Sequence, residues 1–164
     1  MVEADVCTPE MKAKFSTQNE PIMFQSKVKK LSRFNIEQQR VLVLTGDHLY
    51  LFEKNTLNRR HRVTNMSAII KSTVSSELVL VFPSAKDCRL TGLSEERISE
   101  LQSLIQMRYV NKCPTKTLMI FACPTRSLRE YSQDNRRYGF VNLPKDEYRM
   151  RDQEFGGQDE IDAD

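Results

Sequence analysis

Short apolar stretches separated by turn residues dominate the sequence between Pro21 and Asp87, and they recur about every 8–12 residues. In the first stretch Phe24 and Val28 alternate with Lys27, a period typical of a strand with one buried face. A two-residue hairpin turn is expected at 46–47, because glycine supplies the positive φ that such turns require. The pattern predicts seven strands, over residues 24–31, 40–45, 48–53, 57–63, 68–74, 77–82 and 87–91.

A single amphipathic helix is predicted after the last strand. Ser94 is a suitable N-cap, and Glu95 and Glu96 oppose the positive end of the helix dipole. Apolar residues follow at helical spacing, at Ile98, Leu101, Leu104 and Ile105. Residues 111–114 provide a stop. A small curved sheet leaves an open end that an apolar helix face can close, so this order of elements resembles the pleckstrin-homology (PH) superfold. The expected fold is mainly β (α+β), with seven antiparallel strands in curved sheets or a barrel, capped by one C-terminal helix.

Four segments are expected along the chain. Residues 1–20 are polar and are interpreted as a flexible N-terminal segment, and residues 21–112 as the PH-like domain. Residues 113–144 form an extension, in which 115–122 is apolar enough for another strand. Residues 145–164 contain three Lys/Arg against eight Asp/Glu, so they predict a disordered acidic tail.

The composition argues against an enzyme, a metal site and a bound cofactor. The chain has two histidines and five glycines, and it contains no phosphate-binding glycine loop, no zinc-protease motif and no serine-hydrolase motif. Its cysteines, at 7, 88, 113 and 123, form no C-x-x-C pair and are expected to be reduced. A disulfide between Cys113 and Cys123 would need an oxidising compartment. Without a signal peptide or an apolar run of about 18 residues, the chain is expected to be cytoplasmic.

Basic residues concentrate in one part of the sequence. Between Lys27 and Arg62 nine basic residues oppose three acids, a local charge of +6 in a chain of +3. If the first two strands pair, Lys29 and Arg40 approach each other across the mouth of the connecting loop, and Lys30 and Arg33 lie on that loop. Ammonium and guanidinium groups in this arrangement suit phosphate oxygens. The cluster therefore predicts an anion site that can meet a membrane surface.

The same residues resemble a known family. Val28-Lys29-Lys30, a polar loop, and then the run from Arg40 to Thr45 are similar to the PH domain in the tail-homology-1 region of class I myosins. The resemblance covers about residues 22–110. It implies phosphoinositide binding, with Lys29 and Arg40 at the positions of the family's signature lysine and arginine and with Lys27, Lys30 and Arg33 as supporting charges. The sequence departs from the family in lacking a motor domain and in its apolar stretch after the helix.

Each basic segment also has a plainer interpretation. Lys29 and Arg40 could belong to an ordinary solvated sheet face. Residues 59–62 are interpreted as a charged edge strand that prevents sheet-to-sheet aggregation. Phe34 and Ile36 could enter a bilayer or fold back onto the core. Residues 126–138 mix arginine and tyrosine, but the acidic tail that follows would compete with nucleic acid, so nucleic acid is a disfavoured partner.

Two functions remain. The first is a non-catalytic module that binds anionic phosphoinositide membranes, peripheral to a membrane or the cytoskeleton. The second is a protein-interaction or regulatory module, which binds a peptide or cytoskeletal partner in a groove between a strand and the helix, or through the C-terminal extension.

Overall fold

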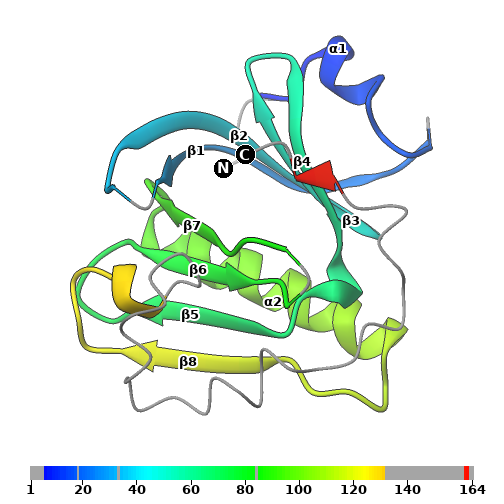
Figure 1. Ribbon diagram of the computed structural model, residues 1–164. Coiled ribbons are helices and arrows are strands. Elements are labelled where there is room, and N and C mark those ends of the chain that lie inside the picture. The colour runs from blue at the N-terminus through cyan, green and yellow to red at the C-terminus, as the bar shows by residue number, and fades with distance from the viewer. Residues whose placement is uncertain (1–5, 18, 33, 84, 132–160, 163–164) are drawn as a thin grey trace.

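One curved sheet and one long helix make up most of the chain (Figure 1). The computed structural model describes residues 6–17, 19–32, 34–83, 85–131 and 161–162. The helices are α1 (Pro9–Lys12) and α2 (Glu95–Lys112), with the short 3-10 helices η1 (Val63–Asn65) and η2 (Arg129–Tyr131). The strands are β1 (Ile22–Leu31), β2 (Glu37–Thr45), β3 (His48–Glu53), β4 (Thr56–Arg62), β5 (Ala68–Ser72), β6 (Leu78–Val81), β7 (Cys88–Thr91), β8 (Met119–Cys123) and β9 (Ile161–Asp162).

The sheet is curved but does not close into a barrel. Its strand order is β8-β5-β6-β7-β1-β2-β3-β4-β9, so β8 lies at one edge and β4 with the short β9 at the other. Strand β1 joins the two halves, because it pairs with β2 along its length and with β7 through Lys29 and Lys30. Gly92 follows β7 and has a φ of +98°, a backbone conformation that favours glycine. A Cβ at this position would lie 3.5 Å from the backbone nitrogen of Lys29 on β1. The mainly β prediction with one C-terminal helix is confirmed.

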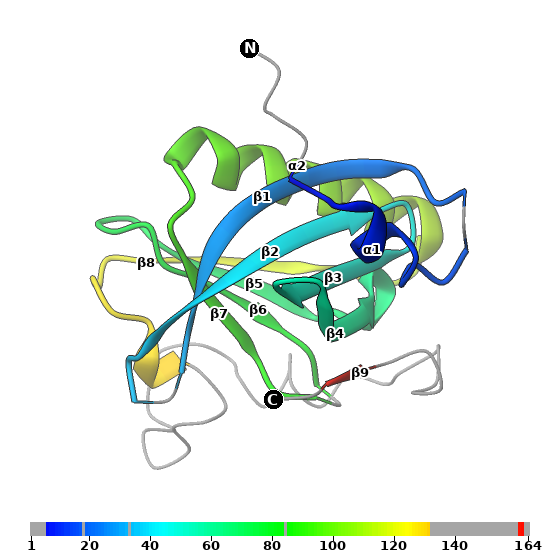
Figure 2. The ribbon, with the colours of Figure 1, turned by 90° about the horizontal axis from the view of Figure 1, so that it is seen from above.

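Alternation along β1 and β2 sends apolar side chains into a shared core. Phe24 and Val28 are buried on one face, opposite Leu44 and Arg40, while Lys27 between them is exposed. Helix α2 packs its predicted stripe into this core, with Ile98, Leu101 and Ile105 buried, and it spans the open side of the sheet in Figure 2. Ser94 caps the helix by accepting a hydrogen bond from the Arg97 N–H at 3.2 Å. No helix in the described part of the chain is both long and apolar enough to cross a membrane.

The extension after α2 adds one more strand to the sheet. Strand β8 pairs parallel with β5, from Ala68 opposite Met119 to Ser72 opposite Cys123, whereas the other pairs are antiparallel. Helix α2 supplies the long crossover that a parallel pair requires. All four cysteines lie in the described part of the chain, are buried, and none is joined in a disulfide.

The N-terminal segment packs on the sheet, which differs from the flexible segment expected over residues 1–20. Cys7, Met11 and Phe15 are buried against Tyr50 and Phe52 on the outer face of the sheet. The Phe15 and Tyr50 rings stack at 4.8 Å. Cys7, Met11 and Phe15 recur every fourth position, so the signal was present in the sequence, but it is short and lies in a polar context.

The turn between β2 and β3 also differs from the prediction. Gly46 does not take the positive φ expected of it.

A buried carboxylate fixes the end of the N-terminal segment. Glu20 accepts hydrogen bonds from Thr45 Oγ1 at 2.5 Å, from the Tyr50 hydroxyl at 2.7 Å and lies 3.1 Å from His48 Nδ1. Burial alone would raise the pKa of Glu20, but these hydrogen bonds and the His48 charge together hold it below its ordinary value. Burial and the Glu20 charge raise the pKa of Tyr50. The Tyr50 hydroxyl therefore fixes the N-terminal segment, because it donates to Glu20 and accepts from the Ser16 N–H at 2.9 Å.

Glu20 should make the stability of the domain depend on acidic pH. Because its pKa is lower in the folded than in the unfolded protein, its stabilisation is present above the unfolded pKa of about 4.5 and is lost as pH falls through the folded value. We expect Glu20→Gln to lower the free energy of unfolding by about 2 kcal/mol at pH 7, since hydrogen bonds to a charged group are lost. Urea unfolding of both proteins at pH 7 and pH 3 measures this. An equal difference at the two pH values would contradict it.

Candidate functional site

The β1–β2 hairpin carries the predicted basic residues, and its register decides which of them share a face. Lys29 pairs with Gln39, and Arg40 pairs with Val28. Paired residues in an antiparallel ladder point to the same side, and neighbours along a strand point to opposite sides. Lys29 and Arg40 therefore lie on opposite faces of the sheet, and they do not form the shared anion site at the mouth of the loop that the sequence suggested. Arg33 lies outside the described residues.

Arg40 and Lys30 lie on the inner face, where both are largely buried. Arg40 Nη1 donates to the Gln39 carbonyl at 2.8 Å and lies 3.2 Å from Glu53 Oε2. Its Nε is also buried, and it has no hydrogen-bond partner among the described residues. The Arg40 Nε–H is therefore an unpaired hydrogen-bond donor, and it lies below the surface of the domain.

Lys27 and Lys29 lie on the outer face and reach solvent. Lys27 is exposed, and Lys29 pairs loosely with Glu37 at 3.6 Å with both side chains about half exposed. An ion pair of this kind contributes little to stability. Both ammonium groups can therefore turn to an external anion at small cost.

A hollow of about 640 Å³ lies where β1 and β2 meet the turn between β3 and β4. It is lined by Lys27, Gln39, Arg40, Val41, Glu53, Lys54 and Thr56. Three of these residues are cations and one is an acid, so the lining carries a formal charge of +2. Lys27 and Arg40 both line this hollow, although their side chains leave the β1–β2 hairpin on opposite faces. The hollow also adds Lys54, which the sequence counted among the basic residues without assigning it a role.

The β1–β2 loop presents two large apolar side chains to solvent. Phe34 is 65% exposed and Ile36 59% exposed. The loop is held by the Ser32 hydroxyl, which accepts from the Phe34 and Ile36 N–H groups at 3.2 and 3.1 Å, and by Asn35 at φ +62°. Of the two expectations for these residues, folding back onto the core is therefore wrong.

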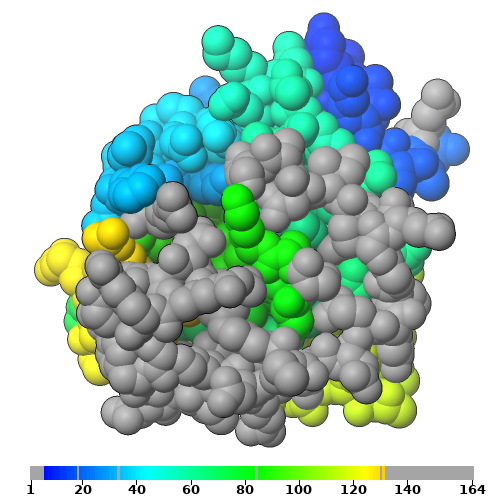
Figure 3. Space-filling model, viewed as in Figure 1, coloured from blue at the N-terminus to red at the C-terminus, as the bar shows by residue number. Residues whose placement is uncertain are grey.

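A buried arginine ties this loop to the rest of the domain. Arg89 on β7 donates to Glu77 Oε1 at 2.7 Å, to Asn35 Oδ1 at 2.6 Å and to the Ser127 hydroxyl at 3.1 Å. Figure 3 shows the yellow end of the described extension directly beside the blue β1–β2 turn, and Figure 2 shows the same neighbours from above. This role was not predictable from the residues around Arg89, because a single arginine in a strand is an ordinary polar residue.

Strand β4 is not the simple solvated edge that the sequence suggested for residues 59–62. Arg59 is buried and donates to the Lys86 carbonyl at 2.6 Å, and the His61 ring stacks on Phe82 at 4.3 Å. The backbone of β4 pairs with β9, with Arg59 opposite Asp162 and Arg60 opposite Ile161.

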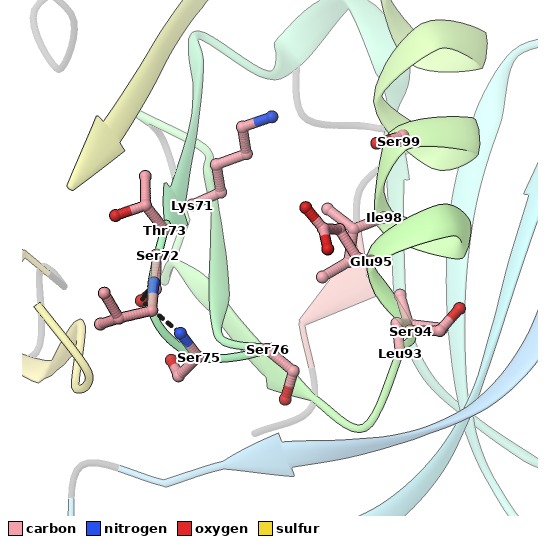
Figure 4. A pocket seen from close by; sticks show the side chains of 11 residues that line it. Lys71, Ser72, Thr73, Ser75, Ser76, Leu93, Ser94, Glu95, Ile98 and Ser99 are labelled. Atoms are coloured by element: carbon pink, nitrogen blue, oxygen red, sulfur yellow. Dashed lines mark hydrogen bonds between the residues drawn. The ribbon is translucent and has the colours of Figure 1, made fainter. Parts of the chain in front are cut away.

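A second hollow, of about 530 Å³, lies between the β5–β6 turn and the start of α2 (Figure 4). Lys71 on one wall and Glu95 on the other balance its charge. Ser72 and Ser75 donate to the carbonyls of Thr125 and Arg126, both at 2.6 Å, so these hydroxyls fasten the extension. A partner peptide could add to the sheet only at an unpaired strand edge, and the outer edge of β5 is already paired with β8. No group of three or more His, Cys, Asp or Glu residues that could hold a metal occurs in the described ranges.

The family comparison matches most of the described domain. A family model described as the unconventional myosin tail, actin- and lipid-binding, matches residues 7–122. This span begins in the N-terminal segment and ends in β8, so it reaches beyond the range of about 22–110 that the sequence indicated. A search of curated proteins finds no match.

Solved structures share the fold at low sequence identity. The N-terminal PH domain of human ARAP2 matches with a TM-score of 0.51 and 11% identity, over 62% of this chain and 90% of that one. The hSac2 domain of the human phosphoinositide phosphatase Sac2 matches with a TM-score of 0.50 and 15% identity, over 71% and 85%. The DH/PH domains of PDZ-RhoGEF in complex with activated RhoA match with a TM-score of 0.51 and 11% identity, over 65% of this chain. This chain spans about a third (34%) of that DH/PH chain.

Proposed function

This chain belongs to the unconventional myosin tail family, which is described as actin- and lipid-binding, and from that premise we propose that it is a non-catalytic module that attaches peripherally to anionic, phosphoinositide-bearing membranes. It would act at the cytoplasmic face of the membrane, near the cytoskeleton. One observation carries the proposal: the β1–β2 hairpin presents solvent-accessible lysines, Lys27 and Lys29, and the exposed apolar side chains of its loop tip, 34–36, side by side in the sequence.

The headgroup part of the proposal rests on the hollow beside the β3–β4 turn. Lys27 and Lys54 would supply mobile ammonium groups there, and Arg40, which also lines the hollow, would add its positive charge. Lys29 on the outer face adds long-range attraction, and Lys30 shares the inner face with Arg40. Each basic group near an anionic leaflet contributes about 1 kcal/mol, so several together give useful affinity. Arg33, on the same loop, would contribute through its charge.

The bilayer part of the proposal rests on the loop tip. Phe34 and Ile36 stand out from the domain on a loop fixed by hydrogen bonds, so their insertion requires no rearrangement of the backbone. Apolar side chains flanked by lysines fit the boundary between acyl chains and anionic headgroups.

Replacing the two outer-face lysines tests the electrostatic part. We expect Lys27→Gln/Lys29→Gln to weaken binding to vesicles of phosphatidylcholine with phosphatidylinositol bisphosphate about 30-fold at low salt, because two contributions of about 1 kcal/mol are lost. The difference should shrink as salt is raised. Sedimentation of the protein with the vesicles over a salt series measures it. Arg40→Ala is a poorer test, because it removes a largely buried side chain together with its ion pair to Glu53 and would therefore also change the stability of the domain.

The matched control removes two positive charges at the far end of the molecule. Lys112 is the last residue of α2, and Lys116 lies four residues beyond it in the sequence. Lys112 pairs with Asp47 in the β2–β3 turn. Lys112→Gln/Lys116→Gln should bind vesicles as the unmodified chain does. Equal losses in both double variants would show that net charge alone matters. Wild-type protein that fails to bind these vesicles at low salt would overturn the lipid proposal.

Actin is the second candidate partner, because the family description names it. The extension is the part of the chain for which a separate protein partner was expected, over 113–164. Its described part lies on the domain itself, through β8 and the carbonyls held by Ser72 and Ser75. Cosedimentation with actin filaments tests this function independently of lipid.

A further inference from the structure

We propose that the domain touches the anionic bilayer at a second place besides the β1–β2 loop tip. This second contact consists of residues 73–76 of the β5–β6 turn and of residues 124–129, which follow β8 in the extension. The inference rests on the lipid function proposed above, and it adds the orientation in which the domain lies on the membrane. Residues 124–129 lie beyond the span 7–122 that the family model matches.

The first observation is the place of the exposed apolar side chains. In the described part of the chain five large apolar residues are exposed: Phe34, Ile36, Val74, Met107 and Val110. The first two lie at the β1–β2 loop tip, and Val74, 51% exposed, lies in the β5–β6 turn. Figures 1 and 2 both show this turn and the β1–β2 loop on the left of the molecule, whereas the C-terminal end of α2 lies on the right. A surface that approaches the loop tip therefore also approaches Val74.

The second observation is that the extension is fastened along this turn. The hydroxyls of Ser72 and Ser75 donate to the carbonyls of Thr125 and Arg126, both at 2.6 Å. The N–H of the residue after Ser72 donates to the carbonyl of Cys123, the last residue of β8, at 2.9 Å. The extension is therefore held beside the exposed valine of the turn by bonds to its backbone, which leave the Arg126 side chain outside this contact.

The third observation is the charge of the second contact. Residues 124–129 contain two arginines and no acidic residue, and residues 73–76 carry no charge. Arg126 is exposed and Arg129 is partly exposed. Glu77 follows the turn, but its carboxylate lies 2.7 Å from the Arg89 guanidinium and is paired there. An apolar side chain beside cations fits the boundary between acyl chains and anionic headgroups, so an anionic bilayer is the partner that suits this surface.

One network connects the second contact to the loop tip. Arg89 donates to Asn35 in the β1–β2 loop at 2.6 Å and to Ser127 in the extension at 3.1 Å. The Leu128 N–H donates to Glu77 Oε1 at 3.2 Å, and the Leu128 side chain is fully buried. The separation of the two contacts is therefore fixed by the fold. Two binding elements held at a fixed separation add their contributions with little further loss of conformational freedom.

A double variant removes the two kinds of group from the second contact. We expect Val74→Ser/Arg126→Gln to bind vesicles of phosphatidylcholine with phosphatidylinositol bisphosphate about 30-fold more weakly at low salt, about fivefold from each substitution. The effect of Arg126→Gln alone should fade as salt is raised, and that of Val74→Ser alone should persist. Sedimentation with the vesicles over a salt series measures all three variants.

The matched control removes one apolar side chain and one cation elsewhere. Val110 lies near the C-terminal end of α2, and Lys116 follows that helix. Val110→Ser/Lys116→Gln should bind the same vesicles as the unmodified chain does. An equal loss in this control would overturn the second contact, because any exposed apolar residue and any cation would then have the same effect.

A single introduced tryptophan reports which surface enters the bilayer. The sequence contains no tryptophan, so the fluorescence of Phe34→Trp, Val74→Trp or Val110→Trp comes from one known position. Each variant is bound to vesicles of the same headgroup composition that contain brominated acyl chains, which quench an indole that reaches them. We expect quenching in Phe34→Trp and in Val74→Trp, and none in Val110→Trp.

The outcomes separate this proposal from the lipid function. Quenching in Phe34→Trp without quenching in Val74→Trp would overturn the second contact and leave the lipid function standing. Quenching in Val74→Trp alone would support the second contact and refute insertion of the loop tip. Unmodified protein that does not bind the vesicles at low salt would overturn the lipid function and the second contact with it.

Discussion

Arg89→Met should lower the free energy of unfolding by about 3 kcal/mol, because it leaves a largely buried carboxylate without its cation. The Arg89 and Glu77 side chains are 4% and 13% exposed, and their atoms lie 2.7 Å apart. The same substitution removes the bonds from Arg89 to Asn35 and Ser127, so it also detaches the β1–β2 loop from the extension. A loss of this size should lower the melting temperature by about 10 °C.

Thermal and urea unfolding measure the fall in melting temperature and in the free energy of unfolding. Two further variants show which interaction is responsible. Arg89→Met/Glu77→Gln should recover part of the loss, because the uncompensated charge is removed as well. Lys29→Met breaks an ion pair with Glu37 that is exposed on both sides, and it should cost less than about 1 kcal/mol. If Arg89→Met were as mild as Lys29→Met, the buried network would not stabilise the domain in the way its geometry indicates.

The strands and the helix were predictable because their signals are local. The alternation of Phe24, Lys27 and Val28 and the helical spacing of Ile98, Leu101 and Ile105 need no knowledge of the rest of the chain. The unpredicted features depend on long-range pairing. Nothing in the sequence near 119–123 says that this strand lies parallel to β5, and the buried positions of the N-terminal segment have meaning only against the outer face of the sheet.

The candidate site shows the same limit more sharply. The sequence identified which residues are basic but not which of them share a face, since one step of register moves a side chain to the other side of the sheet. Because Arg40 pairs with Val28, it turns inward to Glu53, while Lys29 turns outward to Glu37. Arg89 went unnoticed because its three partners are 12, 38 and 54 residues away in the chain.

Phe34→Ser/Ile36→Ser should weaken vesicle binding about 100-fold. Burial of a large apolar side chain contributes about 1.5–3 kcal/mol, and both residues are already partly covered in the free domain, so we expect about 3 kcal/mol for the pair. The unfolding free energy should change by less than about 0.5 kcal/mol, because exposed side chains contribute little to the folded state. The backbone hydrogen bonds to Ser32 remain in the variant.

Two comparisons isolate insertion from other effects of the substitution. Met107→Ser/Val110→Ser replaces two apolar residues of similar exposure, 47% and 62%, on α2, and it should leave vesicle binding unchanged. Apolar burial is not screened by salt, so the effect of the loop variant should persist at high salt, where that of Lys27→Gln/Lys29→Gln fades. A loop variant whose defect disappears with salt, or a helix variant with an equal defect, would mean that the loop tip does not enter the bilayer. The two variants together therefore assign separate roles to the lysines and to the apolar tip of the same hairpin.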